Sequence, residues 1–412
     1  MKFLPPLLLC ACFMYAGNGV AAPSGAVGID TPAKIKHARF ILELDANVAV
    51  LKNLDGEIYA GLDDGKLYKI AISSTENSAR NSAAGQNLAD QNSAANASIN
   101  SNAAQNFNAR ASVNSAGNSE ANTAAINSVE NSAAANSIKQ NSAENSTALN
   151  SAQNSISNSV PSAISKTLIF ALPSSKNYLD EPMGATIFDV DKLGEKYAFL
   201  YNGDAFEKML GVFASGKITH YKLPMTGIKN VYFYDENTVI LLGLGSEILY
   251  FDLSSGKVSF EQKLTIASLG GSAYDRSSGT LLISCEGGIV FYFDAKAKKL
   301  MSQKSLHKDG IYSVALLGDR MMSGSNDKER SCYYENGDFA KFYNAHFAVF
   351  AVALSPELGA FTVGNGVRVI DKAGEIVRSI ELDNDIINYL LFEGDYLVGS
   401  GYNRYIYFWE LK

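Results

Sequence analysis

The sequence predicts an all-β protein, and a repeated unit leads to this fold class. Residues 395–410 contain an apolar strand, a Gly/Ser kink, a polar turn and a second strand, which is the pattern of a β-hairpin. The unit recurs upstream, and one large residue of its second strand returns after successive gaps of 42, 40, 37 and 39 residues. These landmark residues are Phe251, Phe293, Tyr333, Ile370 and Trp409. A period near 40 with such a unit is typical of β-propeller blades.

The number of units predicts the number of blades. Two weaker copies at 57–70 and 197–217 bring the total to seven. Residues 1–22 and 73–166, which are treated below, do not fit the repeat. The remaining residues, 23–72 and 167–412, number 296, or about 42 per blade, which agrees with the ~40–45 residues of such repeats. We therefore expect a seven-bladed β-propeller that contains a long disordered insertion.

The first 22 residues have the pattern of a signal peptide. Lys2 is followed by an apolar run over 3–16, and Val20-Ala21-Ala22 has the small-residue spacing of a cleavage site. The run is shorter than a membrane-spanning helix requires. We expect export to the periplasm with cleavage after Ala22. The alternative is a lipoprotein with Cys12 as the lipidated residue.

The next segments are expected to begin and close the ring. Residues 23–38 carry no strand pattern and are expected to be a linker. Residues 39–72 should supply a strand at 39–44 and the first hairpin. The last blade ends directly after its third strand, so we expect 39–44 to pair beside 405–411. That pairing would leave no open sheet edge between the two ends of the ring.

Residues 73–166 differ in composition from the rest of the chain. Asn, Ser and Ala dominate them, and Phe107 is their only aromatic residue. Such a segment buries too little apolar surface to offset its ordering entropy, so it is expected to be disordered. We interpret it as a tolerated repeat expansion. A glycan-bearing or adhesive tether is the alternative, although Asn96 and Asn145, which begin N-x-S/T triplets, lack the acidic residue two positions earlier.

Composition and cysteine usage restrict the class of protein. The net charge of −7 argues against binding to nucleic acid, because phosphate contacts need a basic face. A hydrophobic content of 47% with 21 Tyr and 21 Phe can fill a large core. Cys285 and Cys332 fall in separate predicted hairpins. We expect them to be free and buried, and a disulfide is the alternative.

The closing hairpin resembles the second half of a Trp-Asp repeat, whose pattern is L-V-S-G-S-x-D-x-T-I-x-V-W-D. In that family a His, a Ser or Thr, the turn Asp and the Trp form a buried hydrogen-bonded tetrad. The resemblance implies a structural tetrad of His307, Ser323, Asp327 and Tyr333, with the imidazole between the Asp327 carboxylate and the Ser323 hydroxyl. His346 resembles the family His less well, because its spacing to the next Ser-Pro is one residue short.

Signals of enzymatic chemistry are missing from the sequence. It contains no H-E-x-x-H, no Cys/His cluster and no G-x-S-x-G elbow. Gly243-Leu244-Gly245 leads into a strand rather than a helix, so it does not predict a phosphate loop. The Asp63-Asp64 and Asp383/Asp385 pairs are explained by turn polarity, although paired carboxylates can bind calcium. We expect no catalytic, cofactor-binding or metal-binding residues and no enzymatic activity.

The expected function is therefore that of a protein-interaction scaffold, because a closed ring presents two rigid faces built from loops. The alternative is a lactonase-type propeller enzyme that uses the central channel. Such an enzyme needs convergent acidic or His residues near the axis, and the sequence does not indicate such a set.

A more specific resemblance covers 39–72 and 166–412. The opening F-I-L-E-L-D and D-G-E-I-Y-A-G-L-D-D-G-K-L-Y-K-I, with the leader and the terminal W-E, resemble the L-type accessory proteins of periplasmic nitrate reductase in Campylobacter-type bacteria. The resemblance implies an accessory role in maturation, assembly or electron delivery, with reductase subunits as partners. The Asn/Ser/Ala insertion departs from that family. A β-barrel assembly lipoprotein, another periplasmic propeller, is the alternative.

Overall fold

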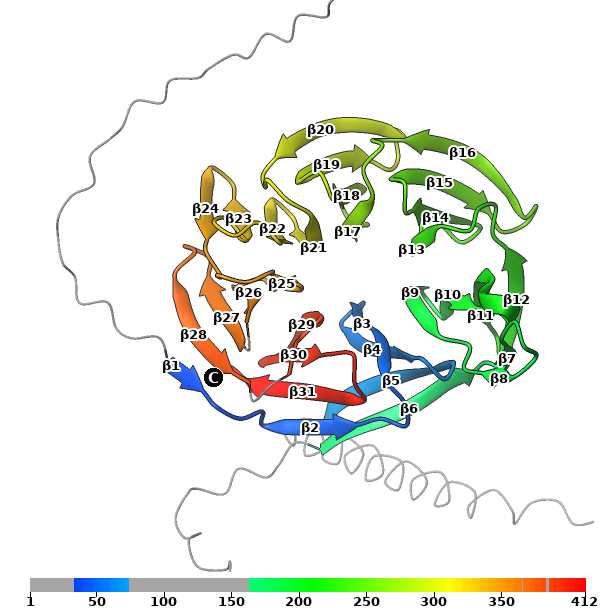
Figure 1. The fold of residues 1–412 in the computed structure, drawn as a ribbon, viewed down its shortest axis with the longest axis horizontal. Helices are drawn as coiled ribbons and strands as arrows, with labels where there is room; N and C mark the ends of the chain where they lie inside the picture. Colours follow the sequence, from blue (N-terminus) through cyan, green and yellow to red (C-terminus); the bar gives the residue numbers. More distant parts are fainter. Residues whose placement is uncertain (1–32, 74–162, 365, 383–384) are drawn as a thin grey trace, which may run out of the picture. The chain divides into compact units, whose positions relative to one another are not determined.

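The computed structural model describes residues 33–73 and 163–412, except 365 and 383–384. Within these residues, seven small sheets stand in a ring around a central axis, so the predicted seven-bladed β-propeller is confirmed (Figure 1). The innermost strands are β3 (Val48–Leu54), β9 (Ile187–Leu193), β13 (Ile228–Phe233), β17 (Leu269–Asp275), β21 (Ile311–Leu317), β25 (Val352–Leu354) and β29 (Tyr389–Glu393).

The remaining strands follow each innermost strand outward in chain order. The first four sheets continue with β4 (Glu57–Leu62), β5 (Lys66–Ser73) and β6 (Ala163–Ala171); β10 (Lys196–Asn202), β11 (Lys208–Ala214) and β12 (Lys217–Lys222); β14 (Thr238–Gly243), β15 (Glu247–Asp252) and β16 (Lys257–Lys263); β18 (Thr280–Cys285), β19 (Ile289–Asp294) and β20 (Lys299–Ser305). The last three continue with β22 (Arg320–Ser325), β23 (Cys332–Asn336) and β24 (Phe339–Tyr343); β26 (Leu358–Val363), β27 (Gly366–Asp371) and β28 (Ile376–Glu381); β30 (Tyr396–Ser400) and β31 (Tyr405–Glu410).

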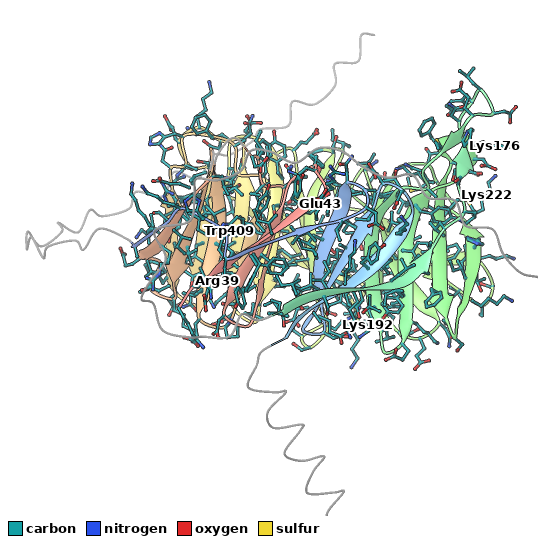
Figure 2. The ribbon with its side chains drawn as sticks, turned by 90° about the horizontal axis from the view of Figure 1, so that it is seen from below. Arg39, Glu43, Lys176, Lys192, Lys222 and Trp409 are labelled. Carbon is teal, nitrogen blue, oxygen red and sulfur yellow. The ribbon has the colours of Figure 1, made fainter. Side chains whose placement is uncertain are left out.

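The alternating strand directions give the ring two different faces. We call the side on which every innermost strand begins the entry face; it carries the loops between sheets and the loops between second and third strands. The opposite side is the exit face. In Figure 2, Glu43, Lys176 and Lys222 lie toward the entry face, whereas Arg39 and Lys192 lie toward the exit face. A short hairpin, β7 (Ser175–Lys176) and β8 (Pro182–Met183), and a 3₁₀ turn, η1 (Asp204–Phe206), stand on the entry face.

The core fills the spaces between neighbouring sheets. In one such space, Leu200 and Leu210 of the second sheet pack with Val231, Leu241 and Phe251 of the third, all nearly inaccessible to solvent. Second and third strands are buried on both faces and are therefore almost continuously apolar, as in β14 and β15. The outermost β16 alternates exposed and half-buried residues instead.

The ring closes as predicted. The strand β2 (Phe40–Glu43) pairs antiparallel with β31, in a register that runs from Phe40 opposite Phe408 to Glu43 opposite Tyr405. The Arg39 N–H donates to the Phe408 carbonyl at 2.7 Å. The predicted pairing of 39–44 with 405–411 is therefore confirmed, and the last sheet obtains its fourth strand from the other end of the chain.

Two boundaries differ from the expectations. Within the expected linker 23–38, Ala33–Ile35 forms β1, which pairs parallel with β28 and adds an ion pair of 2.9 Å between Lys34 and Glu381. This pairing depends on a distant sheet edge, which local sequence does not reveal. At the other boundary, β6 begins at Ala163, inside the expected insertion, because pairing in the first sheet outweighs the Ala/Ser composition.

Some expectations fall outside the described residues. They are the signal peptide at 1–22, the possible lipidation of Cys12, the linker up to residue 32 and the insertion over 74–162. In the chain order, 74–162 separates β5 from β6. Cys285 in β18 and Cys332 in β23 are both buried and free, as predicted.

Candidate interaction face and central pocket

His307 lies in the loop between the fourth and fifth sheets and contacts one of its three predicted partners directly. Its Nε2 is 2.8 Å from Ser323 Oγ, and its Nδ1 is 2.6 Å from the Arg330 carbonyl oxygen. A carbonyl only accepts, so Nδ1 carries the proton and the Ser323 hydroxyl donates to Nε2. Burial lowers the pKa of His307, which favours this neutral form.

The other two members of the predicted tetrad have different partners. The Asp327 carboxylate accepts the backbone N–H groups of Lys308 at 2.9 Å and Glu329 at 3.1 Å, which orders the turn around the imidazole. The Tyr333 hydroxyl donates to Glu335 at 2.8 Å. The Arg330 carbonyl thus takes the place expected for the carboxylate, because the turn folds its backbone toward the ring. The predicted four-residue network is present only as the His307–Ser323 pair.

The remaining candidates of the sequence lie apart from one another. His346 is exposed, and its backbone N–H bonds to Asn344 Oδ1 in a turn with φ of 60°. Gly243 ends β14 at the turn into β15, as the sequence predicted. Asp63 accepts from Asn47, and Asp64 pairs with Lys66 at 2.7 Å, which is the turn polarity we expected. Asp383 lies outside the described residues.

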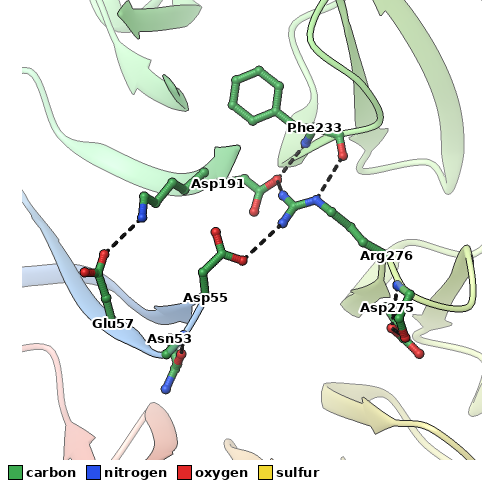
Figure 3. Close-up of polar contacts among 10 residues, drawn as sticks. Asn53, Asp55, Glu57, Asp191, Phe233, Asp275 and Arg276 are labelled. Atoms are coloured by element: carbon green, nitrogen blue, oxygen red, sulfur yellow. Dashed lines mark hydrogen bonds and ion pairs between the residues drawn. The ribbon is translucent and has the colours of Figure 1, made fainter. Parts of the chain in front are cut away.

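The exit side of the channel contains a network of charges that satisfy one another. Arg276, in the loop after β17, contacts the buried Asp191 carboxylate and lies 3.9 Å from Asp55 (Figure 3). The same Asp191 accepts the backbone N–H of Phe233 at 2.6 Å. Nearby, Glu57 pairs with Lys192 at 3.0 Å. These contacts join the first four sheets, and they engage Asp55, Asp191 and Arg276, three of the charged residues around a cavity of about 540 Å³ on this side.

A second cavity, of about 610 Å³, opens at the entry side, and we call it the entry pocket. All seven innermost strands or the loops leading into them contribute to its lining. One wall comes from the first four sheets and carries Lys52, Asp189, Lys229, Asn230 and Ser272. The opposite wall comes from the last three sheets and carries Tyr312, Val314, Phe350, Tyr389 and Tyr402. The entry pocket is therefore charged on one side and aromatic on the other.

The charged wall is already partly neutralised. Lys52 Nζ is 2.6 Å from Asp189 Oδ1 and lies 5.0 Å from the centre of the Tyr232 ring. The other Asp189 oxygen accepts the Val231 backbone N–H at 2.7 Å. Burial opposes the charged form of Lys52, but Asp189 beside it raises the pKa of Lys52, which favours the ammonium form of the lysine. Within the described part of the chain, the hydrogen-bond partners of Lys229 are the backbone carbonyls of Leu269 and Gly270.

Exposed hydrophobic side chains gather on the entry face. Of the sixteen large hydrophobic side chains that are exposed among the described residues, ten lie in its loops or at the start of an innermost strand. They are Tyr178, Leu179, Phe206, Leu244, Ile266, Tyr312, Phe347, Phe350, Ile386 and Tyr402. The other six lie on outer strands or toward the exit face: Ile41, Leu168, Met301, Leu317, Phe339 and Ile376. The two faces of the ring therefore differ in hydrophobic surface.

Several of these side chains also contact one another. Tyr178 at the tip of the β7–β8 hairpin and Phe206 of η1 have ring centres 5.7 Å apart. Tyr312 and Phe350 are 5.4 Å apart on the aromatic wall of the entry pocket. Ile266 is 96% exposed in the loop between the third and fourth sheets, and it is a residue type that folding normally buries.

The sequence motifs did not identify these exposed hydrophobic residues, because the residues belong to none of them. A signal was present: Leu244 stands between two glycines in a turn, and Ile266 lies in a loop where polar residues are usual. The described residues contain no group of three or more His, Cys, Asp or Glu that could hold a metal ion. Of the residues that line the entry pocket, Asp189 is the only acid, and none is a histidine. Among the described helices, none has the length and apolarity to cross a membrane.

Comparisons with known proteins show the fold and no family. No protein-family model matches the chain, and no curated protein matches it. Among solved structures, a chain from the "Crystal Structure of Mitotic Checkpoint Complex" is similar over 97% of this chain and 98% of its own, with 9% identity and a TM-score of 0.57. The computationally designed Ika8 protein is similar over 92% of this chain and 100% of its own, with 8% identity and a TM-score of 0.51.

Proposed function

We propose that the protein is a non-enzymatic interaction scaffold that binds a protein partner through its entry face. The observation that carries this proposal is the uneven distribution of exposed hydrophobic side chains between the two faces. Large apolar side chains that remain exposed together mark interaction surfaces in soluble proteins. The propeller fold is consistent with this role, since its loops are held rigidly by the sheets below them.

The chemistry of the entry face also suits a protein partner. Tyr and Phe are frequent among its exposed residues, and aromatic side chains contribute strongly to binding energy at protein interfaces. Many of its charged groups already pair within the chain, for example Lys66 with Asp64 and Arg404 with Glu43. Apolar contact would therefore supply most of the affinity, and binding should depend only weakly on salt.

We further propose that the protein works in the periplasm as an accessory to nitrate reductase, in maturation, assembly or electron delivery. This finer proposal rests on the leader-like 1–22 and on the resemblance of 39–72 and 166–412 to the L-type accessory proteins. The β-barrel assembly lipoprotein is the alternative, and a Cys12→Ser variant separates the two, because only a lipid-anchored protein would lose membrane association.

The test is an affinity purification from the periplasm of the native host, with mass spectrometry of the bound proteins. We expect wild-type protein to retain reductase subunits and an Ile266→Ser/Tyr402→Ser variant to retain at least tenfold less, because both side chains are exposed on the entry face. Leu317→Ser, an exposed change toward the exit face, is the matched control. Equal retention by both variants would reject the entry face, and retention of outer-membrane assembly proteins instead would reject the reductase.

A further inference from the structure

We propose that the entry pocket binds a carboxylate carried on an aromatic or apolar body, with Lys229 as the partner of the carboxylate. This inference goes beyond the proposed scaffold function, because it concerns a site for a defined chemical group and requires no docking on the surrounding loops. The ligand could be a free small acid or the terminal carboxylate of a peptide, and the experiment below distinguishes these sources.

Lys229 has hydrogen-bonding capacity beyond its contacts with the described residues. An ammonium group has three donors, and among the described residues Lys229 Nζ donates to two backbone carbonyls, those of Leu269 at 3.4 Å and of Gly270. Among the described residues, no carboxylate lies within ion-pair distance of Lys229. The side chain is half-buried at the wall of the cavity. A cation that is partly removed from water and bonded only to neutral groups attracts an anion.

Asp189, the acid that lines the pocket, is already engaged. Asp189 and Glu286 both lie close enough to act on Lys229 electrostatically, but the Asp189 oxygens bind Lys52 at 2.6 Å and the Val231 N–H at 2.7 Å, and Glu286 does not line the pocket. The charged residues that line the entry pocket are Lys52, Lys229 and Asp189, which leaves one net positive charge. The whole chain carries a net charge of −7, so this local excess is unlike its surroundings.

The aromatic wall opposite Lys229 favours a ligand whose carboxylate is attached to an aromatic or apolar group. Tyr312 and Phe350 contact each other with ring centres 5.4 Å apart, and Tyr389 and Tyr402 have ring centres 6.3 Å apart. The Tyr389 hydroxyl donates to the Ala49 carbonyl across the seam between the last and first sheets, so this ring is held in place. A flat apolar group can stack on such rings.

The entry pocket has the size of a small-molecule site. A volume of about 610 Å³ lies within the roughly 300–1,000 Å³ range of small-molecule sites. Most lining residues lie in the innermost strands, and the others, such as Phe350 and Tyr402, lie in loops held at both ends by strands, so the site is largely preformed. A compact amphipathic acid would place its carboxylate at Lys229 and its ring against Tyr312 and Phe350.

The experiment compares an acid with its neutral isostere by titration calorimetry on the full-length protein. The probes are 3-phenylpropanoate and 3-phenylpropanamide, and the peptides are N-acetyl-Gly-Gly-Phe with a free carboxylate and with a terminal amide. We expect at least one acid to bind about tenfold or more tightly than its amide, which is the effect of a charge-assisted hydrogen bond. Tight binding of the small acid indicates a metabolite-like ligand, whereas tight binding of the peptide alone indicates a chain terminus.

Variants test whether Lys229 binds the carboxylate and whether Tyr402 binds the apolar part of the ligand. Lys229→Gln should bring the acid to the affinity of its amide, and Tyr402→Ala should weaken acid and amide alike. Lys257→Gln, which removes the same charge from the exposed start of β16, should leave both affinities unchanged. No preference for either acid in the wild-type protein overturns the proposal, even if Lys229→Gln does not fold. A preference that survives in folded Lys229→Gln also overturns it. Since no protein partner is used, failure here leaves the proposed docking function standing.

Discussion

Glu57 shows how single residues join the sheets. It lies at the start of β4, and its carboxylate accepts bonds from Lys69 of its own sheet, from the Tyr59 hydroxyl at 2.6 Å and from Lys192 of the next sheet at 3.0 Å. These hydrogen bonds, the one from Lys69 first, lower the pKa of Glu57 to about 2. Lys192 is nearly buried, so it depends on this carboxylate for charge compensation.

The first prediction concerns acid stability. The folded-state pKa of Glu57, about 2, lies below its ordinary value of 4.5, so its contribution is complete above about pH 4.5 and disappears as the pH falls to about 2. A Glu57→Gln variant should be less stable than wild type at pH 7, and the two unfolding free energies should converge between these pH values. Denaturant unfolding at a series of pH values measures this.

Glu236→Gln is the control for that experiment, because Glu236 is largely exposed in its pair with Lys196 and should change stability by no more than about 0.5 kcal/mol. The unfolding free energy of Glu236→Gln, plotted against pH, should run parallel to that of wild type. A difference between wild type and Glu57→Gln that stays constant down to pH 2 would show that the Glu57 charge is not the cause.

Among the elements, the four-residue β2 closes the ring by pairing with β31. Its four residues are partly exposed, so they contribute little to the core. They nevertheless cover the edge of β31 and join the first sheet to the last, since the chain runs from β2 directly into β3. By contrast, β1 adds a fifth strand to a sheet that already has four, and it pairs with the outermost of these, β28.

The second prediction follows from this difference. A chain that begins at Leu44 lacks β2 and should lose roughly 4 kcal/mol of unfolding free energy, at about 1 kcal/mol for each of the four paired residues. It should also aggregate more readily, because the edge of β31 becomes open. A chain that begins at Arg39 retains β2 and lacks β1, so it serves as the control. Equal stability of the two truncated chains would contradict a closing role for β2.

At the scale of the whole molecule, the propeller tolerates a break in one of its sheets. Residues 74–162 separate β5 from β6, which are neighbours in the first sheet. The corresponding connection in the second sheet, between β11 and β12, contains only Ser215 and Gly216. The cost of closing a loop grows only with the logarithm of its length, so a long connection is thermodynamically tolerable.

The third prediction is that shortening this connection stabilises the ring. Replacing the 89 residues 74–162 with a four-residue Gly-Ser-Asn-Gly turn should raise the unfolding free energy by about 2–3 kcal/mol through loop entropy. A variant with the same 89 residues in scrambled order should match wild type. Thermal and denaturant unfolding measure both. A shortened chain that is less stable than wild type would show that the segment contributes contacts of its own.

The sequence by itself determined the repeat, the seven blades and the closing strand, because period-2 alternation, turn residues and a 40-residue spacing are local properties. The resemblance of one blade to Trp-Asp repeats also indicated the His307–Ser323 pair. The tertiary structure alone decided the rest. The entry pocket brings Lys229 and Tyr402 to a common cavity from strands and loops of different sheets. Whether a hydrophobic side chain is buried between sheets or remains exposed, as Ile266 does, depends on neighbours that are distant in the chain.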